Sequence, residues 1–121
     1  MSDNLAKQKP VYSVVAPVFN EIGCVEEFYN RISGVMGSLR AAWELVLVDD
    51  GSTDGSTEII RSLAKKDPHV RPVIFARNFG HQIAVTAGLD YARGDAVVVI
   101  DADLQDPPEV ILDLIAKWRG L

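Results

Sequence analysis

Apolar runs alternate with segments of helical periodicity along almost the whole chain. The most continuous run lies at residues 96–100, where β-branched residues follow one another up to Asp101. A run of this kind is typical of a strand buried on both faces in the middle of a parallel sheet. We therefore expect an interior strand here, with Asp101 and Asp103 at its carboxyl end.

The other apolar segments extend this pattern into regular alternation of strands and helices. The expected strands occupy residues 11–17, 44–50, 73–76 and 96–100, and the expected helices lie at about 23–39, 59–64, 82–93 and 110–118. Helices of this length can cross between neighbouring strands, so the order βαβαβαβα predicts a parallel sheet with right-handed connections. No internal repeat, linker or low-complexity segment interrupts it.

The last helix carries its own start signal. Asp106 is expected as its N-cap, Pro107 as the first helical residue and Glu109 as the residue that closes a capping box. The residues expected to face inward from this helix are Ile111, Leu114, Ile115 and Trp118.

Polar side chains follow each predicted strand at the point where it ends. They are Asn20 and Glu21, Asp49 and Asp50, Arg77 and Asn78, and Asp101 and Asp103, in chain order. The carboxyl ends of parallel strands share one edge, which is where open α/β sheets bind ligands. Paired carboxylates would repel one another there, and a shared cation would relieve the repulsion.

Composition narrows the classes of ligand and the architecture. A chain of 121 residues with 48% hydrophobic and 24% charged residues is that of one ordinary globular domain. Its 17 acidic and 12 basic residues give a formal net charge of −5, which argues against a nucleic-acid partner. A phosphate-bearing ligand stays compatible with this charge, because a bound cation inverts the local sign.

The remaining sequence features concern compartment and cysteine chemistry. Cys24 is the single cysteine, which excludes an intramolecular disulfide and a cysteine zinc site, and we expect it in the core on the apolar side of a helix. Residues 1–10 are polar and expected to be disordered. They lack the apolar core of a signal peptide, and no run reaches the roughly 18 to 20 apolar residues of a membrane span. These features favour a cytoplasmic location.

Two common nucleotide-binding motifs are missing. No Gly-x-Gly-x-x-Gly follows the first predicted strand, and no P-loop occurs. Acidic and amide groups at the strand ends indicate instead a metal that holds phosphates, with carboxylates left for ribose hydroxyls or a base edge.

Four motifs at successive strand ends carry a family resemblance. They are PVFNE at 17–21, VDDGSTDG at 48–55, RNFG at 77–80 and DADLQDPPE at 101–109. Together they resemble family 2 glycosyltransferases, whose fold is the GT-A nucleotide-diphospho-sugar transferase fold, a three-layer αβα Rossmann-like parallel sheet. The resemblance covers almost everything from residue 11 onward. The most similar group is the polyprenyl-phosphate glycosyltransferases, including dolichol-phosphate mannose synthase and bactoprenol glucosyltransferases.

The resemblance implies roles for individual residues. A nucleotide diphosphate sugar would contact Pro17, Phe19, Glu21, Val48, Asp50, Asp101, Ala102 and Asp103. Of these, Asp101 and Asp103 would be the catalytic pair, and with Gln105 they would bind Mg²⁺ or Mn²⁺ through the oxygen ligands that such hard cations prefer. Arg77 would contact a phosphate or the acceptor.

Structural roles compete with these assignments. Pro17 could only end a strand, Phe19 could cover the core, and Arg77 could pair with Asp106. Asn78 and Gly80 could only shape a turn, and Asp54 is expected as a helix cap. We expect His69 and His81 to be uninvolved.

The reaction implied by the resemblance is metal-dependent transfer of a sugar, with inversion, from a nucleotide diphosphate sugar to a polyprenyl phosphate. A UDP-sugar is the preferred donor, in cell-wall or lipopolysaccharide biogenesis at the cytoplasmic membrane face. We expect residues 11–121 to be a domain truncated at its C-terminal end, which could leave the chain inactive and expose apolar sheet surface that favours self-association.

Three alternatives remain open. A soluble family 2 enzyme could glycosylate a saccharide hydroxyl, and a donor-binding fragment without turnover would need no acceptor site. A phosphoacceptor receiver domain has similar length, but its acidic pair should follow the first strand and a lysine should end a late strand. Here the pair follows the second strand, and Lys117 lies in a predicted helix.

Overall fold

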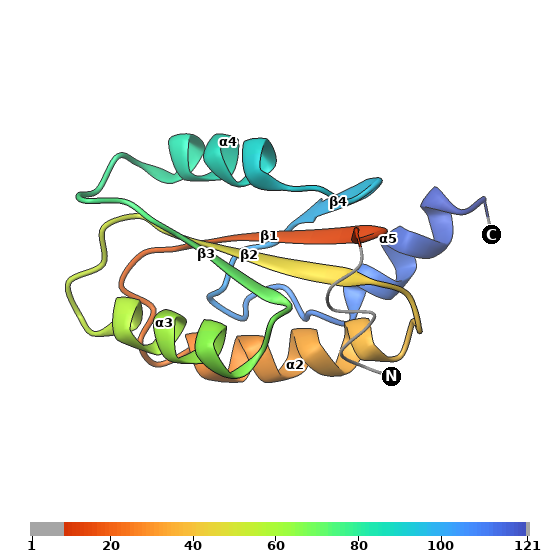
Figure 1. Cartoon of the computed structure of the whole chain (residues 1–121), viewed down its shortest axis with the longest axis horizontal. Helices are drawn as coiled ribbons and strands as arrows, with labels where there is room; N and C mark the ends of the chain where they lie inside the picture. The colour runs from red at the N-terminus through yellow and green to blue at the C-terminus, as the bar shows by residue number, and fades with distance from the viewer. Residues whose placement is uncertain (1–8, 121) are drawn as a thin grey trace.

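The computed structural model describes residues 9–120 and contains one four-stranded parallel sheet (Figure 1). The strand order is β3-β2-β1-β4, and every neighbouring pair is parallel. Most of the tail expected to be disordered, residues 1–8, lies outside the described residues. The elements in chain order are β1 (Tyr12–Val18), α2 (Val25–Gly37), β2 (Trp43–Asp49), α3 (Ser56–Lys66), β3 (Val70–Ile74), α4 (His81–Tyr91), β4 (Ala96–Val99) and α5 (Val110–Trp118).

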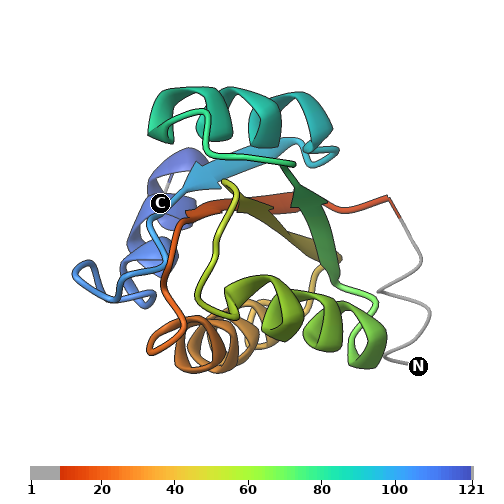
Figure 2. The same cartoon turned by 90° about the vertical axis from the view of Figure 1, so that its left-hand side faces the viewer.

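Helices cover both faces of the sheet and confirm the expected three-layer αβα architecture (Figures 1 and 2). Helix α4 lies over one face, α2 and α3 lie over the other, and α5 lies beside β4. The two central strands, β1 and β2, are buried along their whole length. All four strands therefore direct their carboxyl ends to one edge, the edge that faces the viewer in Figure 2.

Helix α4 approaches the sheet closely because it carries Gly88 at the contact. A Cβ atom on Gly88 would lie 2.3 Å from Val15 Cγ1 and 3.1 Å from Val48 Cγ2. Val15 and Val48 belong to a small core cluster with Val46 and Ala84. This packing fixes the helix across β1 and β2, with its first residue at the carboxyl edge of the sheet.

The expectation that residues 96–100 form an interior strand is wrong for the described sheet. Strand β4 pairs only with β1, so it is an edge strand, and Val97 and Val99 are 38% and 42% exposed. Only one face of the apolar run packs against the main core, through Val98. Helix α4 covers β1 and β2 and leaves the other face of β4 open.

Helix α5 also differs from its expected start and inward face. Ile111 and Ile115 are buried, but Leu114 and Trp118 are 45% and 53% exposed. No capping box forms, because the helix begins at Val110, after Glu109. The Glu109 carboxylate pairs instead with Arg31 of α2, at 2.6 Å from its Nη2.

Smaller differences arise at three other ends of elements. Strand β3 begins at Val70, before Pro72, because an edge strand tolerates proline. Cys24 is the residue before α2 rather than a member of its apolar face, and its thiol is directed at the carbonyl oxygen of Asp103. The N-cap residue of α3 is Gly55 rather than Asp54, which lies one residue earlier and accepts the backbone N–H of Ser56 through its carboxylate at 3.0 Å.

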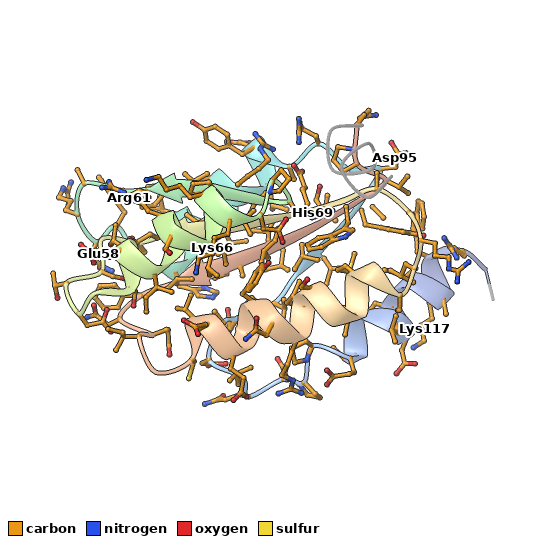
Figure 3. The ribbon with its side chains drawn as sticks, turned by 60° about the horizontal axis from the view of Figure 1, so that its bottom comes forward. Glu58, Arg61, Lys66, His69, Asp95 and Lys117 are labelled. Carbon is orange, nitrogen blue, oxygen red and sulfur yellow. The ribbon has the colours of Figure 1, made fainter. Side chains whose placement is uncertain are left out.

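His69 lies at the opposite end of the sheet from the strand exits. Figure 3 places it with Asp95 toward the end away from Glu58, which marks the start of α3. His69 stacks on Trp43 with ring centroids 4.0 Å apart, and its Nδ1 lies 2.7 Å from Asp67.

No helix within residues 9–120 is both long and apolar enough to cross a membrane.

Candidate active site

One pocket opens where the carboxyl ends of β1, β2 and β4 meet. These strand ends face the viewer in Figure 2. The pocket gathers most of the residues to which the sequence assigned a role, although their segments are distant along the chain. The lining residues are Pro17, Val18, Phe19, Glu21, Asp50, His81, Asp101, Ala102 and Asp103.

Asp50 fixes the loop that follows β3. Its carboxylate accepts hydrogen bonds from the backbone N–H of Phe79 at 2.7 Å and of Gly80 at 3.0 Å, and from Asn78 Nδ2 at 2.9 Å. The side chain is buried, and both of its carboxylate oxygens accept hydrogen bonds from this loop. Asp50 therefore holds the start of α4 against the end of β2.

Gly51 lets the two loops touch. Its φ is +74°, and a Cβ atom there would lie 2.3 Å from the carbonyl carbon of Arg77 and 2.4 Å from the nitrogen of Asn78. Only glycine provides both this backbone conformation and this space. The sequence VDDG thus specifies the close packing of the β2 and β3 exits.

The exit of β1 is tied to the loop before α3. The backbone N–H of Asn20 donates to Ser52 Oγ at 2.9 Å, and Asn20 Oδ1 accepts from the N–H of Thr53 at 2.8 Å. The N–H of Glu21 donates to Ser56 Oγ at 3.1 Å. These contacts hold the backbone of Glu21 in place while its carboxylate lines the pocket.

The pocket carboxylates influence one another. Burial raises the pKa of Glu21 above its ordinary value, and the neighbouring carboxylates, Asp103 first among them, raise it further. Asp103 Oδ1 accepts the backbone N–H of Gln105 at 3.1 Å, across Leu104 with a φ of +65°. The pocket therefore concentrates negative charge that a bound cation would balance.

The donor set suits a hard divalent cation supplied with its ligand. Within residues 9–120, no three His, Cys, Asp or Glu side chains are gathered closely enough to hold a metal by themselves. Asp101 and Asp103 nevertheless line the same pocket with oxygen ligands. Mg²⁺ in particular is often held by one or two carboxylates together with substrate phosphates, and this pocket fits that arrangement.

Three residues given site roles lie outside the pocket lining. The Val48 side chain is fully buried under α4. The Gln105 residue is exposed, and its backbone rather than its amide engages Asp103. Arg77 lies over the ring of Phe79, 4.0 Å from its centroid, and makes no ion pair with Asp106 in the described part of the chain. Their roles stay predictions.

His81, which the sequence left uninvolved, belongs to the pocket. Its Nε2 lies 2.8 Å from Asp101 Oδ1, and both side chains line the cavity. The signal that could have found it is its place directly after the RNFG segment, at the exit of the third strand.

The similarity to known proteins extends over nearly all of the residues that form the fold. The family model described as "Glycosyl transferase family 2" matches residues 13–120. An uncharacterized glycosyltransferase, YkcC, of Bacillus subtilis (strain 168) is 56% identical over 108 residues, covering 89% of this chain and 33% of the relative. A bactoprenol glucosyl transferase of Shigella phage SfV is 49% identical over 108 residues, covering 89% of this chain and 35% of the relative.

A solved structure with 30% sequence identity superposes with a TM-score of 0.77, covering 96% of this chain and 34% of its own. It is the mannosyltransferase PcManGT from Pyrobaculum calidifontis in complex with GDP-Man and Mn²⁺. The chain spans about a third of the length of the curated relatives it matches.

Proposed function

The chain belongs to glycosyl transferase family 2, and we propose that it forms the donor-binding part of a metal-dependent inverting transferase. The donor is a nucleotide diphosphate sugar, with a UDP-sugar preferred, and the acceptor is a polyprenyl phosphate. The observation that carries the proposal is the single pocket that Glu21, Asp50, Asp101 and Asp103 share at the carboxyl edge of the sheet. The similarity to a bactoprenol glucosyl transferase supports the choice of acceptor.

The proposed donor lies across the ends of three strands. Pro17 and Phe19 from β1 and its exit contact the base and ribose, and Glu21 accepts from ribose hydroxyls. Asp50 acts at the base end through the loop it fixes, and Val48 supports that end from beneath. Ala102, buried between the two acids, brings backbone close to the diphosphate.

Asp101 and Asp103 would hold a Mg²⁺ or Mn²⁺ ion, with Gln105 as a further ligand. When bound, such an ion supplies positive charge to the leaving diphosphate. The complex of PcManGT with GDP-Man and Mn²⁺ supports the choice of a divalent cation. Arg77 lies near the same edge as a candidate phosphate or acceptor contact.

The proposed reaction does not need a strong general base. A phosphate oxygen of the acceptor forms a bond to the anomeric carbon from the face opposite the leaving group. The bond from that carbon to the diphosphate breaks, and the nucleoside diphosphate departs with its electrons. A polyprenyl phosphate is already ionised near neutral pH, whereas a saccharide hydroxyl would have to lose a proton.

Calorimetric titration with UDP, GDP and their sugars, with and without Mn²⁺, tests the donor site. We expect binding that requires Mn²⁺ and that weakens by about 10- to 100-fold in Asp103→Asn. Asp113→Asn, on the outer side of α5, is the matched control and should bind like the original chain. Binding that ignores both the metal and Asp103→Asn would contradict the site assignment.

Acceptor assays distinguish the remaining candidates. In a longer version that restores the rest of the length its relatives have, transfer to polyprenyl phosphate is expected, and transfer to free saccharides instead would identify a saccharide-glycosylating enzyme. Donor binding without transfer to either acceptor would identify a donor-binding fragment.

We also propose that the open face and edge of β4 favour association between copies of the chain.

A further inference from the structure

The backbone that leads into His81 is held by a residue at the end of β2. Asp50 at the end of β2 binds the N–H of Gly80, the residue before it, and the N–H of Phe79. His81 then begins α4, whose first helical hydrogen bond runs from the N–H of Ala84 to the carbonyl oxygen of Gly80. The imidazole therefore starts from a backbone that is fixed before any ligand binds.

From this anchored position His81 reaches the end of β4. Its Nε2 lies 2.8 Å from Asp101 Oδ1, which is hydrogen-bond distance for an Nε2–H donor and a carboxylate acceptor. Within residues 9–120, no other side chain or backbone N–H donates to Asp101.

The contact occupies one carboxylate oxygen of Asp101 and leaves the other without a partner in the described part of the chain. Oδ1 is occupied by His81, and Oδ2 receives no hydrogen bond within the described residues. Asp103 is held in the same way, because its Oδ1 accepts the N–H of Gln105. Each acid is thus held by one oxygen and can offer the other to a ligand.

Without His81, Asp101 would be free to rotate. Its side chain is 50% exposed, and an exposed aspartate with no partner samples several rotamers. Ordering such a side chain upon ligand binding costs affinity, and a preformed contact removes that cost.

We propose that His81 is a positioning residue of the donor site, holding Asp101 through Oδ1 so that Oδ2 faces the metal-bound diphosphate of the ligand. This role rests on the proposed function. It acts through Asp101 rather than through contact of the imidazole with the nucleotide.

Three variants separate these roles. His81→Gln keeps an N–H donor close to the place of Nε2, whereas the side chain of His81→Asn is too short to reach Asp101. Gln82→Asn shortens the exposed neighbour on the same turn by the same kind of change and serves as the control. Titration with UDP and GDP in Mn²⁺ should give about tenfold weaker binding for His81→Asn, near-original binding for His81→Gln and no change for Gln82→Asn.

A double-mutant cycle tests whether the effect passes through Asp101. In an Asp101→Ala background, which removes the acceptor oxygen, His81→Asn should change Mn²⁺-supported nucleotide binding by less than about twofold, because the contact is already lost. Independent losses that multiply would show that the imidazole contacts the ligand directly and would overturn the proposal. The urea midpoint of His81→Asn should equal that of the original chain, since both partners are on the surface.

The pair can also be observed without ligand. Long-range ¹H–¹⁵N spectra of the histidine rings should show Nε2 of His81 protonated and shifted by Asp101→Asn, with the His69 signals unmoved. An unshifted His81 ring overturns this inference alone. If the original chain binds no nucleotide under any condition, the proposed function fails as well, whereas intact binding that His81→Asn leaves unchanged overturns only the role of His81.

Discussion

The carboxylate of Asp50, at the end of β2, accepts the backbone N–H of Phe79 at 2.7 Å. The two residues belong to different strand exits, so this contact joins the second and third exits into one unit. The loop it fixes leads directly into α4, and α4 presents His81 to the pocket. The architecture of the pocket wall therefore depends on a buried acid rather than on the exposed ones.

Replacement of Asp50 by Asn should destabilise the chain by about 2 to 3 kcal/mol, because the amide NH₂ would face backbone N–H donors and leave them unpaired. Because the Asp50 side chain is buried, water cannot replace the hydrogen bonds that these donors lose. Urea unfolding followed by circular dichroism measures the change. Asp106→Asn, at an exposed position, should unfold like the original chain, and equal stability of both variants would contradict this role for Asp50.

Gly51 and Gly34 should respond oppositely to alanine. At Gly51 the new Cβ would lie 2.3 Å from the backbone of Arg77 with φ at +74°, so Gly51→Ala should cost about 2 to 4 kcal/mol. Gly34 lies inside α2, and a Cβ atom added there would meet no other atom within 4 Å, so Gly34→Ala should stabilise by about 0.5 to 1 kcal/mol. Thermal and urea unfolding of the two variants provide the comparison, and a harmless Gly51→Ala would refute the close contact between the loops.

Glu44 should make stability depend on acid pH. Burial by itself would raise the pKa of Glu44, but hydrogen bonds from Ser13, the N–H of Arg93 and the Arg71 guanidinium outweigh it and hold the pKa below its ordinary value of 4.5. A group whose pKa is lower in the folded state stabilises the fold above its unfolded pKa. That stabilisation is lost as the pH falls from about 4.5 through the lower folded value.

The corresponding measurement is the unfolding free energy between pH 7 and pH 3. Glu44→Gln should lower it by about 2 to 3 kcal/mol at pH 7 and flatten its fall at acid pH, because the buried carboxylate contacts Arg71 at 2.8 Å. Glu58→Gln, on the exposed side of α3 in Figure 3, should keep the original pH profile. Parallel profiles for Glu44→Gln and the original chain would exclude Glu44 as the source.

The sequence could predict which segments meet at the pocket because strand ends are local signals. Apolar runs that stop at Glu21, Asp50 and Asp103 require only that the sheet be parallel for these residues to share an edge. The hydrogen bond between His81 and Asp101 needed more, namely the order of the strands and the anchoring of α4 by Asp50. Neither can be deduced from local periodicity, so the contact was not predicted, although the place of His81 directly after RNFG could have located it at the same edge.

The same limit explains the misplacement of β4. Residues 96–100 are apolar on both faces, which indicates burial without identifying what buries them. The structure fills one face with the main core and places α4 over β1 and β2 instead of β4. Burial of Val48 under α4 likewise follows from the close approach at Gly88, a property of the packed helix rather than of the strand.

The open edge of β4 yields a prediction about self-association. Val97 and Val99 form an exposed apolar strip, and β4 pairs with no strand other than β1 in the described sheet, so no strand covers its outer edge. We expect the apparent mass in sedimentation experiments to rise with protein concentration. Val99→Lys should weaken this association, because a charge would have to be desolvated at the contact. Ile83→Lys, at an exposed apolar position on α4, serves as the control and should associate like the original chain. A constant monomer mass, or equal effects of the two substitutions, would rule out β4 as the contact.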